Sequence, residues 1–286
     1  MRPAALPLLT VVLISGCANL TAVREFAQDT RQISAAFDPL LGQTVEHCRA
    51  GFLDKRLYTT DQPLARFDAT EALARASQAC QPLEASNTIA QGMSQALADY
   101  ATRLGALADA GVVDSVSDDY TRLSTQLGQF SALPPAQVGA VGALLSFVTR
   151  GVIARGQQAA IEEALSHEEA VGALADALVT YAERVYGAYL RQRLDDQPLL
   201  VEALRGETAA PIASRLQILA LHRRTETLAG QQQAIASLRA AVAQMKATLR
   251  DLRAHLNHLS AQERWVEVRK LGREVRSLRQ QWVKAF

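Results

Sequence analysis

The chain has 286 residues, of which 49% are hydrophobic and only 5% aromatic. This length is ample for one or two domains with a core of their own, and the excess of Ala, Leu and Gln over aromatic residues favours long helices. The formal net charge of +1 excludes a strongly acidic or basic chain as a whole, but it conceals an uneven distribution of charge along the sequence.

The N-terminus has the order of a secretory signal. Arg2 precedes an apolar run over 4–14, and small residues follow at Ser15 and Gly16. The last four residues of this segment, Ile14-Ser15-Gly16-Cys17, resemble the lipobox of bacterial lipoproteins, in which the signal is removed before the Cys and the thiol is acylated. The resemblance covers about the first twenty residues.

This resemblance implies a lipid anchor and an address. Cys17 would carry the acyl chains, palmitate among them, and residues 1–16 would be the signal peptide. Two acyl chains are already enough for stable attachment to a membrane. Because Ala18 rather than Asp follows the Cys, the resemblance implies the outer membrane, on its periplasmic face, as the location in the cell envelope.

Helical spacing begins close to the predicted anchor. Apolar residues over 20–37 recur every three or four positions, which predicts a first helix. Asp38-Pro39 fits the start of a second helix that ends near Arg49, and we expect a loop over 51–63. Asp68, three residues before Glu71, has the spacing of a capping box and predicts a short helix to Cys80.

The three Cys predict one disulfide. If Cys17 carries lipid, Cys48 and Cys80 remain, and an even pair in an oxidising compartment usually forms a bond. The bond would join the helix that ends near Cys48 to the short helix at Cys80. Two free buried thiols are the alternative and would argue against export.

Further helices follow in order along the chain. A strong helix is predicted over 87–111. Ser117 is expected to cap the next helix, whose buried face would consist of Tyr120, Leu123, Leu127 and Phe130. The apolar segment 136–154 is at the short end of a membrane span and is interrupted by Gly and Arg, so we predict a buried, central helix.

The middle of the chain continues this pattern. Ser166 to Glu169 is a second capping box, which either restarts a helix or lies within one, and the apolar stripe continues over 174–189. A turn is expected over 195–198, and then a short helix to Arg205.

The C-terminal part has heptad spacing. Apolar residues from Ile235 to Leu259 alternate by three and four over four heptads, which predicts a coiled-coil helix starting near Ile212. Ser260 then begins a new capping box, and a last helix over 261–286 follows. We interpret this as an antiparallel hairpin that projects from the bundle; the alternative is one continuous helix.

This part of the chain is also basic. From Arg215 onward it carries 14 Lys and Arg against 5 Asp and Glu, whereas the preceding residues carry 16 against 24. The two parts attract each other, or the basic part binds an acidic partner, or Arg and Gln merely solvate a long helix. The predicted partner-binding residues are Arg250, Arg253, Arg264, Trp265, Arg269, Lys270, Arg273, Arg276, Arg279 and Trp282. Nucleic acid is not expected in the periplasm.

The candidates for catalysis are few. His255 and His258 lie three apart but lack the further ligands of a metal site, and Glu163 and His167 have no second copy of the motif that di-iron bundles require. No motif for nucleophilic catalysis or phosphate binding occurs. We therefore expect neither a metal nor another cofactor, and no enzyme activity.

The prediction is an all-α, elongated multi-helix bundle with a C-terminal coiled-coil hairpin. Residues 17–207 would form the bundle and 208–286 the long basic helix and hairpin. The expected function is that of a membrane-tethered scaffold that binds a protein partner or a second copy. The alternative is a bundle that binds a small apolar ligand near 136–154 or neutralises a toxin.

Overall fold

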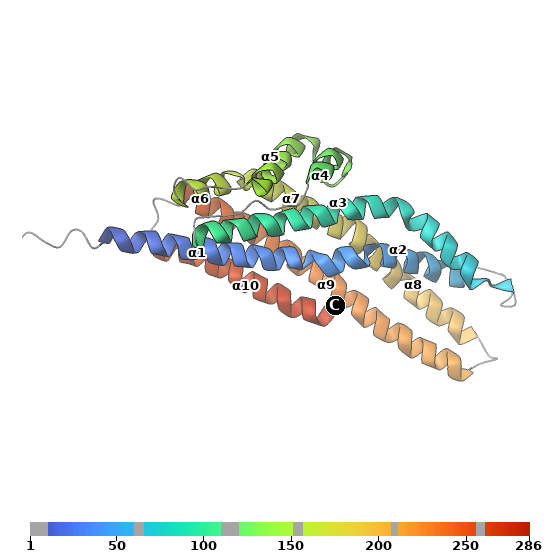
Figure 1. Ribbon diagram of the computed structural model, residues 1–286. Helices are drawn as coiled ribbons and strands as arrows, with labels where there is room; N and C mark the ends of the chain where they lie inside the picture. The colour runs from blue at the N-terminus through green and yellow to red at the C-terminus, as the bar shows by residue number, and fades with distance from the viewer. Residues whose placement is uncertain (1–10, 60–65, 110–119, 151–156, 207–210, 256–260) are drawn as a thin grey trace, which may run out of the picture.

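The computed structural model describes residues 11–59, 66–109, 120–150, 157–206, 211–255 and 261–286 (Figure 1). Within these ranges the chain is all-α, as predicted. The helices are α1 Val11–Ala35, α2 Phe37–Thr59, α3 Ala69–Asp109, α4 Thr121–Gln126, α5 Val138–Thr149, α6 Gln157–Ser166, α7 Glu168–Tyr181, α8 Gly187–Gly206, α9 Pro211–His255 and α10 Ala261–Ala285. A π-helical stretch, Ala182–Tyr186, joins α7 to α8.

The long helices run side by side and form an elongated bundle, and α4, α5 and α6 lie together at its upper side (Figure 1). Helix α1 packs on α3 and α10, α2 on α3 and α8, and α9 on α8, α7 and α1. One hydrophobic core includes residues from α1 through α10, so residues before and after 207 share it. Among the described residues, no helix is both long and apolar enough to cross a membrane.

Helices α9 and α10 form the predicted antiparallel hairpin. Gln244 Nε2 donates to Glu267 Oε2 at 3.1 Å, and Gly230 lies beside Ala285, so the two helices run in opposite directions. The alternative of one continuous helix is therefore wrong. The heptad side chains that are buried are Ile235, Leu238, Val242, Met245, Leu249, Leu252, Val268, Leu271, Val275 and Leu278. Residues 256–260, with Ser260, lie outside the described ranges.

The hairpin does not project from the bundle. Helix α10 packs along α1, and α9 packs against α7 and α8. The physical reason is that the apolar stripe of a two-helix hairpin remains half exposed until further helices cover it, and α1, α7 and α8 provide that cover.

Three predicted breaks do not occur. Helix α2 continues through Gly51 to Thr59, so the loop predicted over 51–63 is wrong as far as Thr59. Helix α3 is a single helix that contains Pro82, and α8 contains Pro198 where a turn was predicted. A proline inside a helix costs about 3 kcal/mol, and the packing of these helices on their neighbours offsets that cost. Helix α3 is visibly bent in Figure 1.

The local signals at other helix starts had mixed outcomes. Asp68 Oδ1 accepts hydrogen bonds from the backbone N–H groups of Thr70 at 2.8 Å and Glu71 at 3.1 Å, so this predicted cap is confirmed. A helix does restart at Glu168, but His167 occupies the capping position and makes no capping bond. The capping box predicted from Ser166 is therefore wrong.

Helix α5 is peripheral, contrary to the prediction of a central helix. It spans only Val138–Thr149, buries Val141, Leu145 and Val148, and exposes Ala143. Small residues line its outer side, which explains why its sequence is apolar on more than one face although only one face is buried.

Candidate functional site

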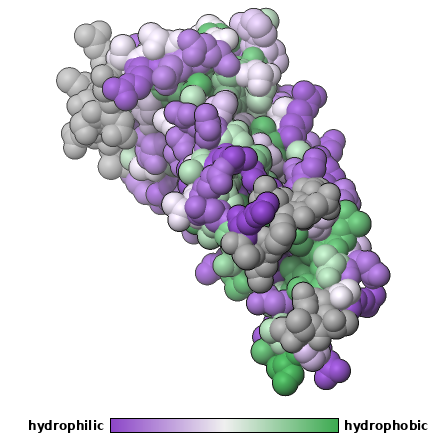
Figure 2. All heavy atoms as spheres, turned by 90° about the vertical axis from the view of Figure 1, so that its right-hand side faces the viewer, coloured by the Kyte–Doolittle hydropathy of each residue, from purple (hydrophilic) through white to green (hydrophobic). Residues whose placement is uncertain are grey.

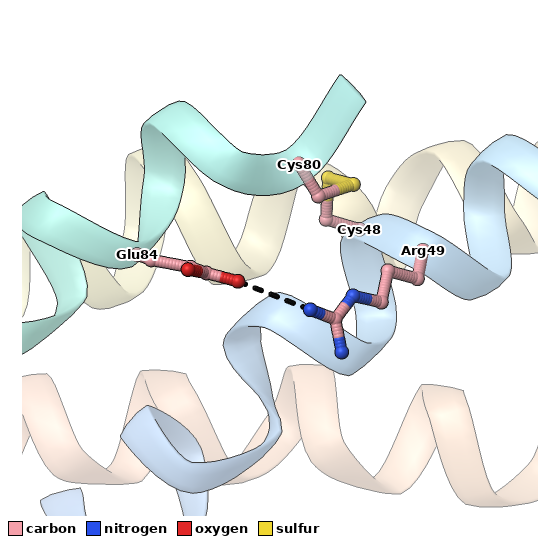
Figure 3. Close-up of a disulfide and its surroundings, with 4 residues drawn as sticks. All are labelled: Cys48, Arg49, Cys80 and Glu84. Atoms are coloured by element: carbon pink, nitrogen blue, oxygen red, sulfur yellow. Dashed lines mark hydrogen bonds and ion pairs between the residues drawn. A yellow bond between two sulfur atoms is a disulfide. The ribbon is translucent and has the colours of Figure 1, made fainter. Parts of the chain in front are cut away.

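The disulfide joins two long helices. Cys48 on α2 and Cys80 on α3 are bonded, with a Cα–Cα distance of 6.0 Å, and Arg49 pairs with Glu84 at 3.0 Å beside them (Figure 3). The predicted bond is therefore present in the structure. Cys17 lies in the first part of α1, where side chains fall outside the described part of the chain, so its lipidation stays a prediction.

The basic part of the chain pairs with the acidic part inside the molecule. Glu168 on α7 accepts ion pairs from Arg253 at 3.1 Å and Arg250 at 3.5 Å. Lys246 pairs with Asp176, and Arg239 with Glu183 at 3.3 Å. Of the three explanations for the uneven charge, mutual attraction of the two parts therefore accounts for these four contacts.

The remaining predicted partner-binding residues are spread over α10. Lys270 pairs with Glu267 on the same helix. Arg276 faces Asp29 of α1, whose pKa is raised to about 6 because burial and the charge of Glu25 outweigh the attraction of Arg276. Arg269, Arg273 and Arg279 are exposed. The structure describes the backbone of Arg264 and Trp265 as part of α10, but not their side chains.

Trp282 lines a groove between α1 and α10. The groove has a volume of about 280 Å³, and its other lining residues are Gln32, Ala35, Ala36, Val275, Leu278, Arg279 and Val283. The ring of Trp282 stacks near that of Phe286, with 4.8 Å between the centroids. The structure therefore brings Trp282 together with Arg279, but in a shallow apolar groove.

A second hollow lies beside the segment 136–154, where the sequence suggested an apolar ligand site. It has a volume of about 300 Å³ between α4 and α5. Four of its lining residues carry hydroxyls on α4 or α5: Thr121, Ser124, Ser146 and Thr149. A predominantly apolar ligand does not match this lining.

A buried polar network joins α2, α8 and α9, and nothing in the sequence singled it out. His47 Nδ1 accepts a hydrogen bond from Arg193 Nη1 at 2.6 Å. Because a guanidinium only donates, the proton of this imidazole is on Nε2, which lies 3.2 Å from the hydroxyl of Tyr186 and 3.3 Å from Gln43 Oε1. Gln231 of α9 also donates to Gln43, at 3.2 Å.

Arg193 also connects the network to a buried carboxylate. Its Nε donates to Asp54 Oδ2 at 3.3 Å, and Arg224 of α9 pairs with the same oxygen. Burial, Arg193 and Arg224 together lower the pKa of His47 to about 4. Perturbed pKa values are typical of functional sites, but His47, Asp54 and Arg193 are each less than one-tenth exposed, which is the arrangement of a polar link between helices.

Arg103 is a buried cation with a capping role. Its Nη1 donates to the carbonyl of Val148 at 2.7 Å, and its Nη2 donates to the carbonyl of Arg150. Its guanidinium also lies 4.7 Å from the ring centroid of Phe147. These carbonyls belong to the end of α5, where a cation is favoured by the helix dipole. Arg103 therefore holds α5 against α3.

Exposed hydrophobic side chains gather at one end of the bundle. We call these residues the apolar end: Leu57, Phe67, Leu73, Leu199, Ile212, Leu216 and Leu219. They are seven of the ten large hydrophobic residues that are exposed in the described ranges, with exposed fractions from 39% to 72%. All lie within eight residues of the end of α2, the start of α3, the end of α8 or the start of α9. Eight residues correspond to about 12 Å along a helix axis.

These helix ends lie together at the right of Figure 1, and Figure 2 faces them and shows hydrophobic surface there. The sequence alone predicts one part of the apolar end, the stripe on α9, because its residues are four and three positions apart: Ile212, Leu216 and Leu219. On α9 the inward position is taken by Ser214, which is buried, so the apolar stripe points outward. Which four helix ends meet is a tertiary feature that no local pattern contains.

The apolar end carries excess positive charge. Arg56, Arg66, Arg215 and Arg223 form no ion pair within the described ranges, and three of them are exposed. Of the acidic side chains nearby, Glu71 and Glu202 pair with Arg75 and Arg205, whereas Asp68 caps α3 and keeps its negative charge. Glu226 lies 3.6 Å from His222.

The described residues include no cluster of three or more His, Cys, Asp or Glu placed to hold a metal ion. In comparisons with known proteins, no protein family, no curated protein and no solved structure matches this chain. The functional argument therefore depends on the geometry of the chain itself.

Proposed function

We propose that this chain is a non-enzymatic lipoprotein of the cell envelope that is tethered through Cys17 and acts as a scaffold through its apolar end. The observation that supports this proposal is the placement of the two features. Helix α1, which contains Cys17, begins at one end of the elongated bundle, and the apolar end lies at the other (Figure 1). A protein anchored by α1 would present the apolar end away from the anchoring membrane.

Exposed apolar surface is the second support. Soluble proteins rarely expose several large hydrophobic side chains in one patch unless the patch contacts a partner or a membrane. The helices that carry the apolar end are held in position from within by the network of His47, Arg193 and Asp54. A rigid support of this kind keeps a contact surface in place.

Site-specific photo-cross-linking in cells tests the proposal. A photoreactive amino acid at Leu216 is expected to yield an adduct with its partner, protein or phospholipid, whereas the same amino acid at Ser277, which is exposed on α10, is expected to yield none. The adduct is expected to weaken in a Cys17→Ser form, which also loses the incorporation of labelled palmitate. Equal adducts from both positions, or none from Leu216, would contradict the proposal.

The basic face of α10 is tested in the same cells. Arg273→Glu with Arg279→Glu reverses two exposed charges on α10. If the partner binds the basic hairpin, as the sequence suggests, this variant loses the adduct formed at position 216 and Ile212→Asp does not. If the partner binds the apolar end instead, Ile212→Asp loses the adduct and the variant of Arg273 and Arg279 keeps it.

Ligand binding is the second candidate, and the groove between α1 and α10 favours it. Ala35, Ala36 and Leu278 give this groove an apolar lining, and Arg279 stands at the same groove. Saturable binding of a fluorescent fatty acid that Ala35→Trp abolishes would support this function. Binding that survives Ala35→Trp would place the ligand elsewhere.

A further inference from the structure

The apolar end combines exposed hydrophobic side chains with an excess of cations. Its aliphatic and aromatic side chains are contributed by four helix ends. The described residues within eight positions of those ends include six cations, Lys55, Arg56, Arg66, Arg75, Arg205 and Arg215, and four carboxylates, Asp54, Asp68, Glu71 and Glu202. Around it, Arg56, Arg66, Arg215 and Arg223 form no ion pair with any residue that the structure describes. A surface of this kind is matched by a partner that is apolar in its interior and negatively charged at its surface.

We propose that the apolar end inserts into the surface of an anionic lipid bilayer. This inference depends on the proposed function, since it names the partner of the same contact surface. Combined with acylation of Cys17 at the opposite end, it makes the chain a link between two membranes, or between two patches of one membrane.

The dimensions of the apolar end fit shallow insertion. Its side chains lie within about 12 Å of the helix ends. Interfacial segments bury their apolar face about 5–10 Å into the boundary between headgroups and acyl chains. Leu57 and Ile212, which lie two and one residues from their helix ends, would therefore enter first, with Leu199 and Leu219 at the level of the headgroups.

The start of α9 carries both components of binding. Ile212, Leu216 and Leu219 form one exposed stripe, and Arg215 and Arg223 lie beside it on the same helix. An apolar stripe flanked by arginine is typical of helices that lie at membrane surfaces. A cation near an anionic leaflet is attracted with an energy that corresponds to about a fivefold change in binding.

A fluorescent label reports insertion directly. In a Cys17→Ser background, Leu216→Cys gives one reactive thiol, because Cys48 and Cys80 are bonded to each other. An environment-sensitive label at this position is expected to brighten and shift to the blue with vesicles of phosphatidylglycerol and phosphatidylethanolamine. The matched control is Ser277→Cys, which is exposed on α10 outside the groove and is expected to show no change.

Sedimentation with the same vesicles measures affinity. Ile212→Asp with Leu216→Asp is expected to lower the bound fraction of the Cys17→Ser chain at least tenfold relative to Ser277→Asp. Arg215→Gln with Arg223→Gln is expected to lower it about 25-fold at 0.1 M salt and little at 0.5 M salt. The apolar run near the N-terminus is common to all these variants, so differences between them report on the apolar end. Unchanged helical circular dichroism shows that each variant is folded.

The outcomes separate the two proposals. No response of the label at position 216, or equal sedimentation of the Ile212/Leu216 and Ser277 variants, would overturn insertion into lipid. If Leu216 still cross-links to a protein in cells, the scaffold proposal stands and its partner is a protein. If no adduct forms either, both proposals fail. Equal response to vesicles of pure phosphatidylcholine would also overturn the assignment, since it would leave the arginines without a role.

Discussion

At the scale of single residues, His47 makes the stability of the bundle depend on pH. Burial and the neighbouring Arg193 and Arg224 lower its pKa from 6.5 to about 4 in the folded chain. The neutral form is therefore favoured by folding, and this contribution is complete above pH 6.5 and is lost as the pH falls through 4. The loss amounts to about 3 kcal/mol, since one pKa unit corresponds to about 1.4 kcal/mol.

A His47→Gln variant isolates this contribution. The amide oxygen keeps an acceptor for Arg193 but does not titrate, so its free energy of unfolding is expected to change less between pH 7 and pH 4.5 than that of the wild type. Urea unfolding at the two pH values measures the difference. An identical pH dependence in both proteins would show that His47 is not the titrating group.

Asp29 acts in the opposite direction. Its pKa is raised to about 6 by burial between α1 and α10 and by Glu25, so folding favours the protonated carboxyl. Its contribution to stability is complete below pH 3.8 and is lost as the pH rises through 6. Asp29→Asn is expected to be more stable than the wild type at pH 8 by about 1 kcal/mol, a figure reduced because the carboxyl is only half buried. At pH 4 the thermal midpoints of the two proteins should coincide, and a variant that is less stable at pH 8 would contradict this reasoning.

At the scale of helices, the disulfide ties α2 to α3. Cys48 and Cys80 are 32 positions apart in the sequence. Closing a loop of this length restricts the unfolded chain by about 3–4 kcal/mol. Cys48→Ala with Cys80→Ala is expected to lose this amount in urea unfolding while it keeps its helical circular dichroism. Reduction of the wild type serves as the control and should give the same midpoint, whereas an unchanged midpoint would mean that the unfolded chain is compact without the bond.

Patterns that repeat along one helix were predictable, and features made by two helices were not. The heptads of α9 and the cap at Asp68 depend only on residues a few positions apart. Pro82 and Pro198 predicted breaks because a proline inside a helix destabilises that helix. Packing of α3 and α8 on their neighbours outweighs this cost, so both helices continue. The contact of His47 with Arg193 spans 146 residues. The apolar end likewise depends on which helix ends meet, so only the stripe on α9 was visible in advance.

At the scale of the whole molecule, α9 makes the bundle one cooperative unit. It spans about 68 Å at 1.5 Å per residue and packs on α1, α6, α7, α8 and α10. Because its buried heptads belong to the same core as α1 and α3, removing residues 231–286 would expose that core rather than detach an appendage. Point variants, not truncations, are therefore the means to locate the contact surface.

This arrangement predicts a single unfolding transition. Both Trp residues of the chain, Trp265 and Trp282, are on α10. Their fluorescence therefore reports on the C-terminal hairpin, whereas far-ultraviolet circular dichroism reports on all helices. If the chain unfolds as one unit, the two signals have the same urea midpoint and the same slope. If residues 208–286 fold as a domain apart from 17–207, the fluorescence midpoint differs from that of the helical signal, and the shared core would then not couple the hairpin to the rest of the bundle.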